Sequence, residues 1–308
     1  MTLLYKADAE RGRAWQALFA EHAPDIEVRL WPDVGDPADI RYVFAWIPPD
    51  NLNERFPNLQ VVFATSAGID QFDLQALPPE VPVVRMLDPG IPRAIVEYAT
   101  LAVLNLHRDI PLFLNQQRQH QWLLGTPLTP RERRVGVMGL GNLGRSVLEH
   151  LRGYGFDLRG WARSARAIEG VRCFSGQAQL LEFLGECDIL VCLLPLTDDT
   201  RHILDVRTLA ALPSGASLIN LGRGGHINEE HLLAALDSGH LSHAVLDVME
   251  DEPPSPDHPF WQHPKVWLTP HVGAVTLPQS GFSVLLENIR AHERGESMHG
   301  LVDKSQGY

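Results

Sequence analysis

A glycine-rich turn between a strand and a helix constrains the fold of this chain more than any other feature. The apolar run 135–138 (VGVM) leads directly into 139–144 (GLGNLG), and a helix with apolar Val147, Leu148 and Leu151 follows. In such a unit the first glycine allows a tight turn, the second lets the backbone approach a pyrophosphate, and the third permits close packing of the helix on the strand. The N-terminus of the helix adds unpaired N–H groups and positive potential. The sequence therefore predicts a dinucleotide site, rather than a simple turn, at Gly139, Gly141, Asn142, Leu143 and Gly144.

The end of the next predicted strand indicates which dinucleotide binds. This strand ends at Trp161-Ala162-Arg163-Ser164, about 20 residues beyond the glycines, where an NAD site normally carries an acid for the ribose 2′-hydroxyl. No acid is present there. Arg163, with Ser164 and Arg166 close by, suits a 2′-phosphate because guanidinium binds phosphate oxygens in two-pronged geometry. We expect NADP(H) as the preferred cofactor and NAD(H) as the alternative, with an ordinary solvated arginine loop as the other interpretation.

The rest of the chain shows two α/β halves. A length of 308 residues favours two domains. Helical or irregular stretches separate the predicted strands, and this alternation indicates doubly wound parallel sheets. Residues 91–119 are predicted to form a long helix interrupted near Pro111. The predicted strands of the first half are 3–5, 28–31, 42–47, 60–65 and 81–86; those of the second half are 134–138, 158–161, 188–194, 216–221, 243–248 and 266–268.

Composition excludes several classes of partner. A net charge of -12 makes nucleic acid and anionic membranes poor partners. The longest apolar stretch, 189–196, is too short to span a bilayer. Charge appears early, at Lys6 and Asp8, which argues against a signal peptide and favours a cytoplasmic protein. The three cysteines, an odd number without a C-x-x-C pair, are expected to be buried thiols in a reducing compartment: Cys173, Cys187 and Cys192.

Three segments near predicted strand ends carry the residues expected to do chemistry. They are 220–224 (NLGRG), 246–253 (LDVMEDEP) and 269–273 (TPHVG). Catalytic side chains of open α/β sheets gather at the carboxyl ends of the strands, so Arg223, Glu252 and His271 are expected to converge. Each has an ordinary alternative when taken singly: a helix cap, a surface acid and a structural histidine.

The order of these segments resembles that of the D-2-hydroxyacid dehydrogenase family, and the resemblance is closest to its glyoxylate/hydroxypyruvate reductase A branch. It covers essentially the whole chain, with further matches at Ala67-Gly68-Ile69-Asp70, Leu194-Pro195-Leu196-Thr197 with Thr200, and Gly307-Tyr308. The resemblance implies a Rossmann cofactor domain (102–274) inserted in a flavodoxin-like substrate domain (1–101 and 275–308). It also implies a homodimer, in line with the frequency of symmetric assemblies.

The same resemblance implies a role for each catalytic residue. Arg223 would hold the carboxylate of a 2-keto acid and polarise its keto oxygen. His271 would protonate that oxygen. Glu252 would orient the imidazole, and a carboxylate in that place raises the pKa of a neighbouring imidazole. No metal is expected.

The resemblance further implies contacts with cofactor and substrate. Leu194, Pro195, Thr200 and Asp247 are expected at the cofactor, with Asp247 near the nicotinamide amide. Backbone N–H groups of Gly68 and Ile69 are expected to meet the substrate carboxylate, although Ser66 replaces the usual glycine of this loop. Two tryptophans match aromatic positions near the substrate, with burial in a core as the alternative for both: Trp46 and Trp122.

We expect NADPH-dependent reduction of small 2-keto acids, glyoxylate and hydroxypyruvate, to glycolate and D-glycerate. One alternative is an NAD-linked D-2-hydroxyacid dehydrogenase with another substrate, because the family shares Arg223, Glu252 and His271 across substrates. The other is a dinucleotide-sensing, corepressor-like protein without turnover, against which the intact Arg223, Glu252 and His271 argue.

Overall fold

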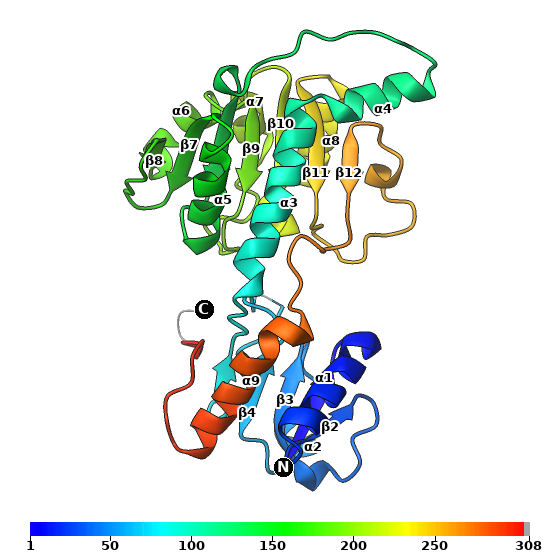
Figure 1. The fold of residues 1–308 in the computed structure, drawn as a ribbon, viewed down its shortest axis with the longest axis vertical. Helices are drawn as coiled ribbons and strands as arrows, with labels where there is room; N and C mark the ends of the chain where they lie inside the picture. Colours follow the sequence, from blue (N-terminus) through cyan, green and yellow to red (C-terminus); the bar gives the residue numbers. More distant parts are fainter. Residues whose placement is uncertain (70, 305–308) are drawn as a thin grey trace. The chain divides into compact units, whose positions relative to one another are not determined.

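The chain folds into two compact units, each built on a parallel sheet (Figure 1). The structure, a computed structural model, describes residues 1–69 and 71–304. Unit 1 contains Met1–Ile91 and the chain from Val275 onward, and unit 2 contains Pro92–Ala274. The first division falls between Ile91 and Pro92, earlier than the expected 101/102, inside a helix that runs without a break from Gly90.

Unit 1 is built on a five-stranded sheet. Its order is β2-β1-β3-β4-β5, and every neighbouring pair is parallel. This is the strand order of flavodoxin-like proteins. The strands are β1 (Thr2–Lys6), β2 (Glu27–Leu30), β3 (Ile40–Ala45), β4 (Val61–Ala64) and β5 (Val83–Val84).

Apolar side chains lie on both faces of this sheet, as in other parallel sheets, which are covered on both sides. On one face Trp15 and Phe19 of α1 pack with Leu285 and Ile289 of α9. Figure 1 shows these two helices beside each other. On the other face α2 contributes Leu52. The helices and single turn of 3-10 helix are α1 (Ala9–His22), η1 (Pro37–Asp39), α2 (Leu52–Arg55) and α9 (Pro278–Glu293).

Unit 2 is built on a seven-stranded parallel sheet of order β12-β11-β10-β9-β6-β7-β8. The chain starts at β6, adds strands on one side, and then returns to add β9 on the other side. The switch point of this doubly wound sheet therefore lies between β6 and β9, where such folds bind their ligands. The strands are β6 (Arg134–Met138), β7 (Asp157–Ala162), β8 (Val171–Ser175), β9 (Ile189–Cys192), β10 (Ala216–Asn220), β11 (Leu241–Leu246) and β12 (Val266–Leu268).

The helices of unit 2 lie between the strands along the chain. The helix predicted to be interrupted near Pro111 is broken at Asp109, which adopts a left-handed conformation (φ 55°) between α3 and α4. Pro111 lies in the first turn of α4, where a missing N–H costs nothing. The helical segments are α3 (Gly90–His107), α4 (Ile110–Arg118), η2 (Pro130–Glu132), α5 (Asn142–Arg152), η3 (Gln177–Gln179), α6 (Leu180–Leu184), α7 (Val206–Ala211), η4 (Gly224–His226), α8 (Glu229–Asp237) and η5 (Pro259–Trp261).

The fold class predicted from the sequence is confirmed: two doubly wound parallel sheets, with unit 2 inserted in unit 1. The sequence did not predict β8, an edge strand whose residues are mostly half-exposed and therefore show no continuous apolar run. Cys187 and Cys192 are buried and Cys173 is half-buried, and no cysteine is in a disulfide. No helix within residues 1–69 and 71–304 is long and apolar enough to cross a membrane.

Candidate active site

The glycine turn follows β6 at the switch point and has the geometry its sequence predicts. Gly139 has φ +99° and donates its N–H to Trp161 O on β7 (2.8 Å). A Cβ at Gly144 would overlap the carbonyl of Gly139, so this glycine lets α5 pack against the turn. A Cβ at Gly141 would meet nothing within 4 Å. Open space therefore lies at the glycine that precedes the helix N-terminus at Asn142 and Leu143, as a pyrophosphate requires.

The arginine loop begins beside this turn, because β7 pairs with β6 and ends at Ala162. Arg163, Ser164 and Arg166 are all exposed. Neither guanidinium takes part in an ion pair with any other residue that the structure describes. The loop thus offers two cations without protein counter-ions next to the glycine turn.

A second loop of the cofactor prediction follows β9 across the switch point. Leu194 is buried and Pro195 is exposed. The hydroxyl of Thr200 donates to Pro195 O (2.7 Å) and accepts from Thr197 N (2.8 Å). Thr200 therefore closes this loop and fixes its shape.

Arg223 follows β10 and has its backbone held on both sides. Its N–H donates to Nδ1 of His226 (3.0 Å), and its carbonyl accepts from Nδ2 of Asn220 (2.9 Å). Both supporting side chains are fully buried. One guanidinium nitrogen donates to Gly222 O (2.8 Å). The base of this side chain is thus rigid where β10 ends.

Glu252 and His271 form a direct pair. Oε2 of Glu252 lies 2.8 Å from Nδ1 of His271, and Oε1 accepts from Met249 N (3.0 Å). Burial acts to raise the pKa of Glu252, but the hydrogen bond and charge of His271, the Met249 N–H and the charge of Arg223 together lower it. Glu252 is therefore a carboxylate, and His271 carries its Nδ1 proton toward it, which directs Nε2 away from the acid.

The turn that carries His271 is held by Asp247. His271 has φ +53°, which is unusual for a residue with a side chain. Its N–H donates to Asp247 O (2.8 Å). The buried carboxylate of Asp247 accepts from Val272 N (2.8 Å), Gly273 N (2.7 Å) and the hydroxyl of Thr269 (2.6 Å). Asp247 thus fixes the backbone around His271, a role that the sequence did not predict beside its expected contact with the nicotinamide amide.

The substrate residues predicted in unit 1 also lie after strands. Trp46 follows β3 and is half-buried, and its backbone N–H donates to Lys6 O (3.1 Å). Gly68 follows β4 and is half-buried, whereas Ile69 belongs to the core of unit 1. Ser66, which replaces the usual glycine, donates its hydroxyl to Gly68 O (2.6 Å) and so closes the loop. Asp70 and the terminal Gly307-Tyr308 lie outside the described residues.

Trp122 belongs to unit 2, in the irregular segment after α4, and its side chain is 95% exposed. Its alternative interpretation as a core residue is therefore wrong.

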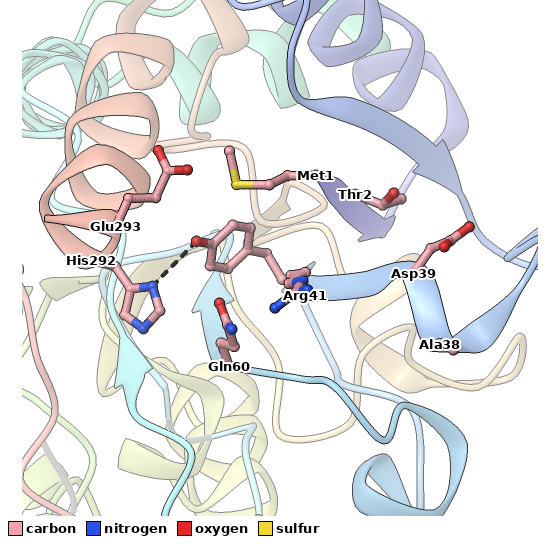
Figure 2. Close-up of a pocket in the computed structure, with 9 residues that line it drawn as sticks. Met1, Thr2, Ala38, Asp39, Arg41, Gln60, His292 and Glu293 are labelled. Carbon is pink, nitrogen blue, oxygen red and sulfur yellow. Dashed lines mark hydrogen bonds between the residues drawn. The ribbon is translucent and has the colours of Figure 1, made fainter. Parts of the chain in front are cut away.

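Unit 1 also carries a polar depression (Figure 2). Its volume is about 620 Å³, and its charged lining is mixed, with Asp39 and Glu293 beside Arg41. The dashed line at His292 in Figure 2 marks a hydrogen bond between Nδ1 and the hydroxyl of Tyr42 (3.2 Å). None of the predicted site residues lines it.

Unit 2 thus brings Arg223, Glu252 and His271 together at the carboxyl ends of its strands. Of the supporting residues, Asn220 could be noticed in the sequence only as a polar residue at the end of an apolar strand, and Asp247 was expected only as a contact of the cofactor. No group of three or more His, Cys, Asp or Glu side chains that could hold a metal occurs in the part of the chain that the structure describes.

A glycine turn at the switch point of a doubly wound sheet, with an acid–histidine pair and an arginine at neighbouring strand ends, defines an NAD(P)-dependent oxidoreductase. Residues 100–273 match the family model described as the D-isomer specific 2-hydroxyacid dehydrogenase NAD-binding domain. The chain belongs to the D-isomer specific 2-hydroxyacid dehydrogenase family, which confirms the resemblance seen in the sequence.

Similar proteins are known over the full length. A glyoxylate/hydroxypyruvate reductase A of Serratia proteamaculans is 38% identical over an alignment of 318 positions that covers all of both chains. A D-isomer specific 2-hydroxyacid dehydrogenase of Xanthobacter autotrophicus, solved with NADPH and MES, is 40% identical with a TM-score of 0.89 and covers 100% of this chain and 99% of its own. An NADPH-dependent glyoxylate/hydroxypyruvate reductase of Sinorhizobium meliloti, solved with NADP and sulfate, is 35% identical with a TM-score of 0.90 and the same coverage.

Proposed function

We propose that this enzyme reduces glyoxylate and hydroxypyruvate with NADPH, forming glycolate and D-glycerate. The observation that carries the proposal is the 2.8 Å pair of Glu252 and His271 in the same unit as Arg223 and the glycine turn. The names of the Serratia and Sinorhizobium relatives support the choice of substrates.

The proposed chemistry needs an anchor for the substrate and a proton for its keto oxygen. When bound, the dinucleotide would supply a hydride to the keto carbon. Arg223 binds the substrate carboxylate and stabilises negative charge on the keto oxygen by charge-assisted hydrogen bonds. His271 gives that oxygen a proton from Nε2, while Glu252 holds Nδ1 and so fixes the orientation of the imidazole. Asp247 and Glu252 together determine where the imidazole lies.

In unit 1 we propose that the N–H groups of Gly68 and Ile69 bind the substrate carboxylate as well, and that Trp46 contacts the substrate. Ser66 supports this by holding the loop closed. Small substrates suit a pocket with such a bulky side chain.

For the cofactor, the residues present fit a dinucleotide with a 2′-phosphate. Gly139, Gly141 and Gly144 would border the pyrophosphate, and Arg163 with Arg166 would bind the 2′-phosphate. Leu194, Pro195, Thr200 and Asp247 are proposed near the nicotinamide half. Bound NADPH and NADP in the Xanthobacter and Sinorhizobium structures support the same choice.

Steady-state kinetics on a panel of 2-keto acids, with NADPH and NADH in parallel, tests this proposal. We expect the highest kcat/KM with glyoxylate or hydroxypyruvate and NADPH. Preference for NADH and a larger acid would favour the NAD-linked alternative. NADPH that binds but is not oxidised with any substrate would favour the corepressor-like alternative.

We further propose that the enzyme acts as a homodimer. On α4 the apolar side chains of Ile110, Leu112, Phe113 and Leu114 are 38–48% exposed, and Trp122 and Leu124 after it are almost fully exposed. A cluster of exposed apolar side chains usually marks an interaction surface. Light scattering is expected to give twice the chain mass, and Phe113→Asp is expected to shift it toward the monomer.

A cytoplasmic location is proposed from the unpaired cysteines, because oxidising compartments favour disulfides. Cell fractionation of the native host tests it.

A further inference from the structure

Glu229, the first residue of α8, holds both ends of the loop 249–258. Its Oε1 accepts from the backbone N–H of Glu250 (3.0 Å), and its Oε2 lies 3.1 Å from Nε2 of His258. The side chains of Glu229 and His258 are only 22% and 19% exposed, so the contact between them is largely shielded from water. No other side chain that the structure describes contacts both ends of this loop through hydrogen bonds.

The second contact requires one particular tautomer of His258. Nδ1 of His258 accepts from the N–H of Phe260 (3.3 Å), which caps η5. Because Nδ1 accepts, Nε2 must carry the proton of the neutral ring and donate it to Glu229. The phenyl ring of Phe260 is buried in the core of unit 2. Glu229 therefore ties the far end of the loop to a turn that the core itself fixes.

The first contact lies one peptide away from the catalytic pair. The N–H of Met249 donates to Oε1 of Glu252, and the next N–H, that of Glu250, donates to Glu229. A Cβ at Gly224 would overlap this same Met249–Glu250 peptide, so Gly224 packs directly on it. The Met249–Glu250 peptide is thus held by Glu229 and Gly224, whereas Glu252 holds the preceding peptide through Met249 N and reaches His271 with Oε2.

We propose that Glu229 is a positioning residue for the Glu252–His271 pair, acting through the Met249–Glu250 peptide and through His258. The proposal rests on the proposed function, in which that pair supplies the proton. Loss of Glu229 lets the loop move, so that Glu252 spends less time against Nδ1 of His271. Contacts of Glu250 with His202 (3.1 Å) and Arg201 (3.7 Å) are more exposed and hold only the side chain of that residue.

An acid in the first turn of a helix also stabilises the helix through its dipole. Glu230 separates the two roles, because it is the next acid in the first turn of α8, is exposed, and makes no hydrogen bond or ion pair with the described residues. Glu230→Ala is therefore the matched control for Glu229→Ala.

The experiment compares the full-length wild type, Glu229→Ala and Glu230→Ala by hydrogen exchange and by the pH dependence of kcat for glyoxylate reduction. For Glu229→Ala we expect the Met249 and Glu250 amides to exchange at least roughly tenfold faster and kcat to fall about tenfold. In the pH profile of kcat, the midpoint on the high-pH side, which belongs to the coupled Glu252–His271 pair, should move down by about 0.5–1 unit. The Kd of the variant for NADPH should stay within about twofold of the wild-type value. Glu230→Ala should match the wild type in every measurement.

Equal behaviour of Glu229→Ala and Glu230→Ala would overturn the proposal. So would a lower kcat with an unchanged pH midpoint and unchanged exchange. If Glu229→Ala does not fold, Glu229→Gln takes its place. The amide oxygen of the glutamine still accepts from Glu250 N, but its amide nitrogen cannot accept from His258. The same changes in exchange, kcat and pH midpoint, reduced in size, are then expected. Wild-type turnover is judged separately: a wild type without turnover refutes the proposed function, whereas the exchange rates still decide whether Glu229 holds the loop.

Discussion

At the scale of single residues, His271 is the side chain whose replacement separates chemistry from binding. His271→Ala removes the proposed proton donor, so kcat is expected to fall by about 100-fold or more, while the Kd for NADPH stays within about twofold. Steady-state kinetics and a fluorescence titration measure the two effects. His22→Ala, an exposed histidine at the end of α1, is the control. Wild-type turnover by His271→Ala would refute the assignment of the acid.

Arg163 makes a second prediction at this scale, about cofactor choice. Arg163→Asp replaces a cation that has no counter-ion among the described residues by an anion, which repels a 2′-phosphate. The NADPH Kd is expected to rise at least about tenfold, whereas the NADH Kd changes little. Arg13→Asp, which makes the same charge change on the exposed surface of α1, should alter neither. An unchanged ratio of the two affinities would show that Arg163 does not contact the phosphate.

At the scale of elements, the turn after β12 depends on a carboxylate from the end of β11. Asp247→Asn replaces one acceptor oxygen by a donor that faces backbone N–H groups, in a site that is almost fully buried. The free energy of unfolding is expected to fall by about 1–3 kcal/mol, and kcat by at least about tenfold because His271 lies in that turn. Urea unfolding and kinetics measure both. A stable variant with unchanged kcat would show that the turn is held by other contacts.

The pairing of β6 with β9 leads to a pH prediction. Asp188, which precedes β9, accepts from the backbone N–H (2.8 Å) and side chain of Arg134 at the start of β6. Burial acts to raise the pKa of Asp188, but the bonds and charge of Arg134 lower it below 3.8. A lowered pKa means that this stabilisation is present above about pH 4 and is lost as the pH falls through the native pKa.

Asp188→Asn is therefore expected to cost about 1.5–3 kcal/mol at pH 7, the range for hydrogen bonds to charged groups, and much less at pH values below the native pKa. Urea unfolding at several pH values measures the difference. Asp50→Asn, in an exposed loop, should cost little at any pH. A cost that does not change with pH would contradict the charge-based explanation.

At the scale of the whole molecule, the two units have separate cores, and the glycine turn belongs to unit 2 alone. NADPH at a concentration of about 100 times its Kd adds about 2.7 kcal/mol to the free energy of unfolding of the unit that binds it. We expect the slowest amides of β6 and β9 to exchange up to about 100-fold more slowly with NADPH, and those of β1 and β3 to change less. Hydrogen exchange by mass spectrometry measures this. Equal slowing in both sheets would show that the units unfold together.

Local patterns were enough to predict the features that depend on neighbouring residues. The strand–turn–helix unit around Gly139 was correct because Gly139 has a positive φ and Gly144 has no room for a Cβ. Most strands were correct because buried parallel strands are continuous apolar runs. The edge strand β8 lacks that run and was missed. The break before α4 was predicted near Pro111, but the left-handed Asp109 makes it.

The sequence by itself determined the fold class, the glycine turn, and the identity of the residues placed after each strand, since these follow from short-range periodicity and from the chain order of a doubly wound sheet. Only the tertiary structure decided which of those residues touch. Asp247 reaches the turn of His271 through Val272 and Gly273, and Glu229 reaches Glu250 and His258. Such hydrogen bonds join groups from different loops, and their partners are selected by the packing of the sheet and helices, which no local pattern encodes.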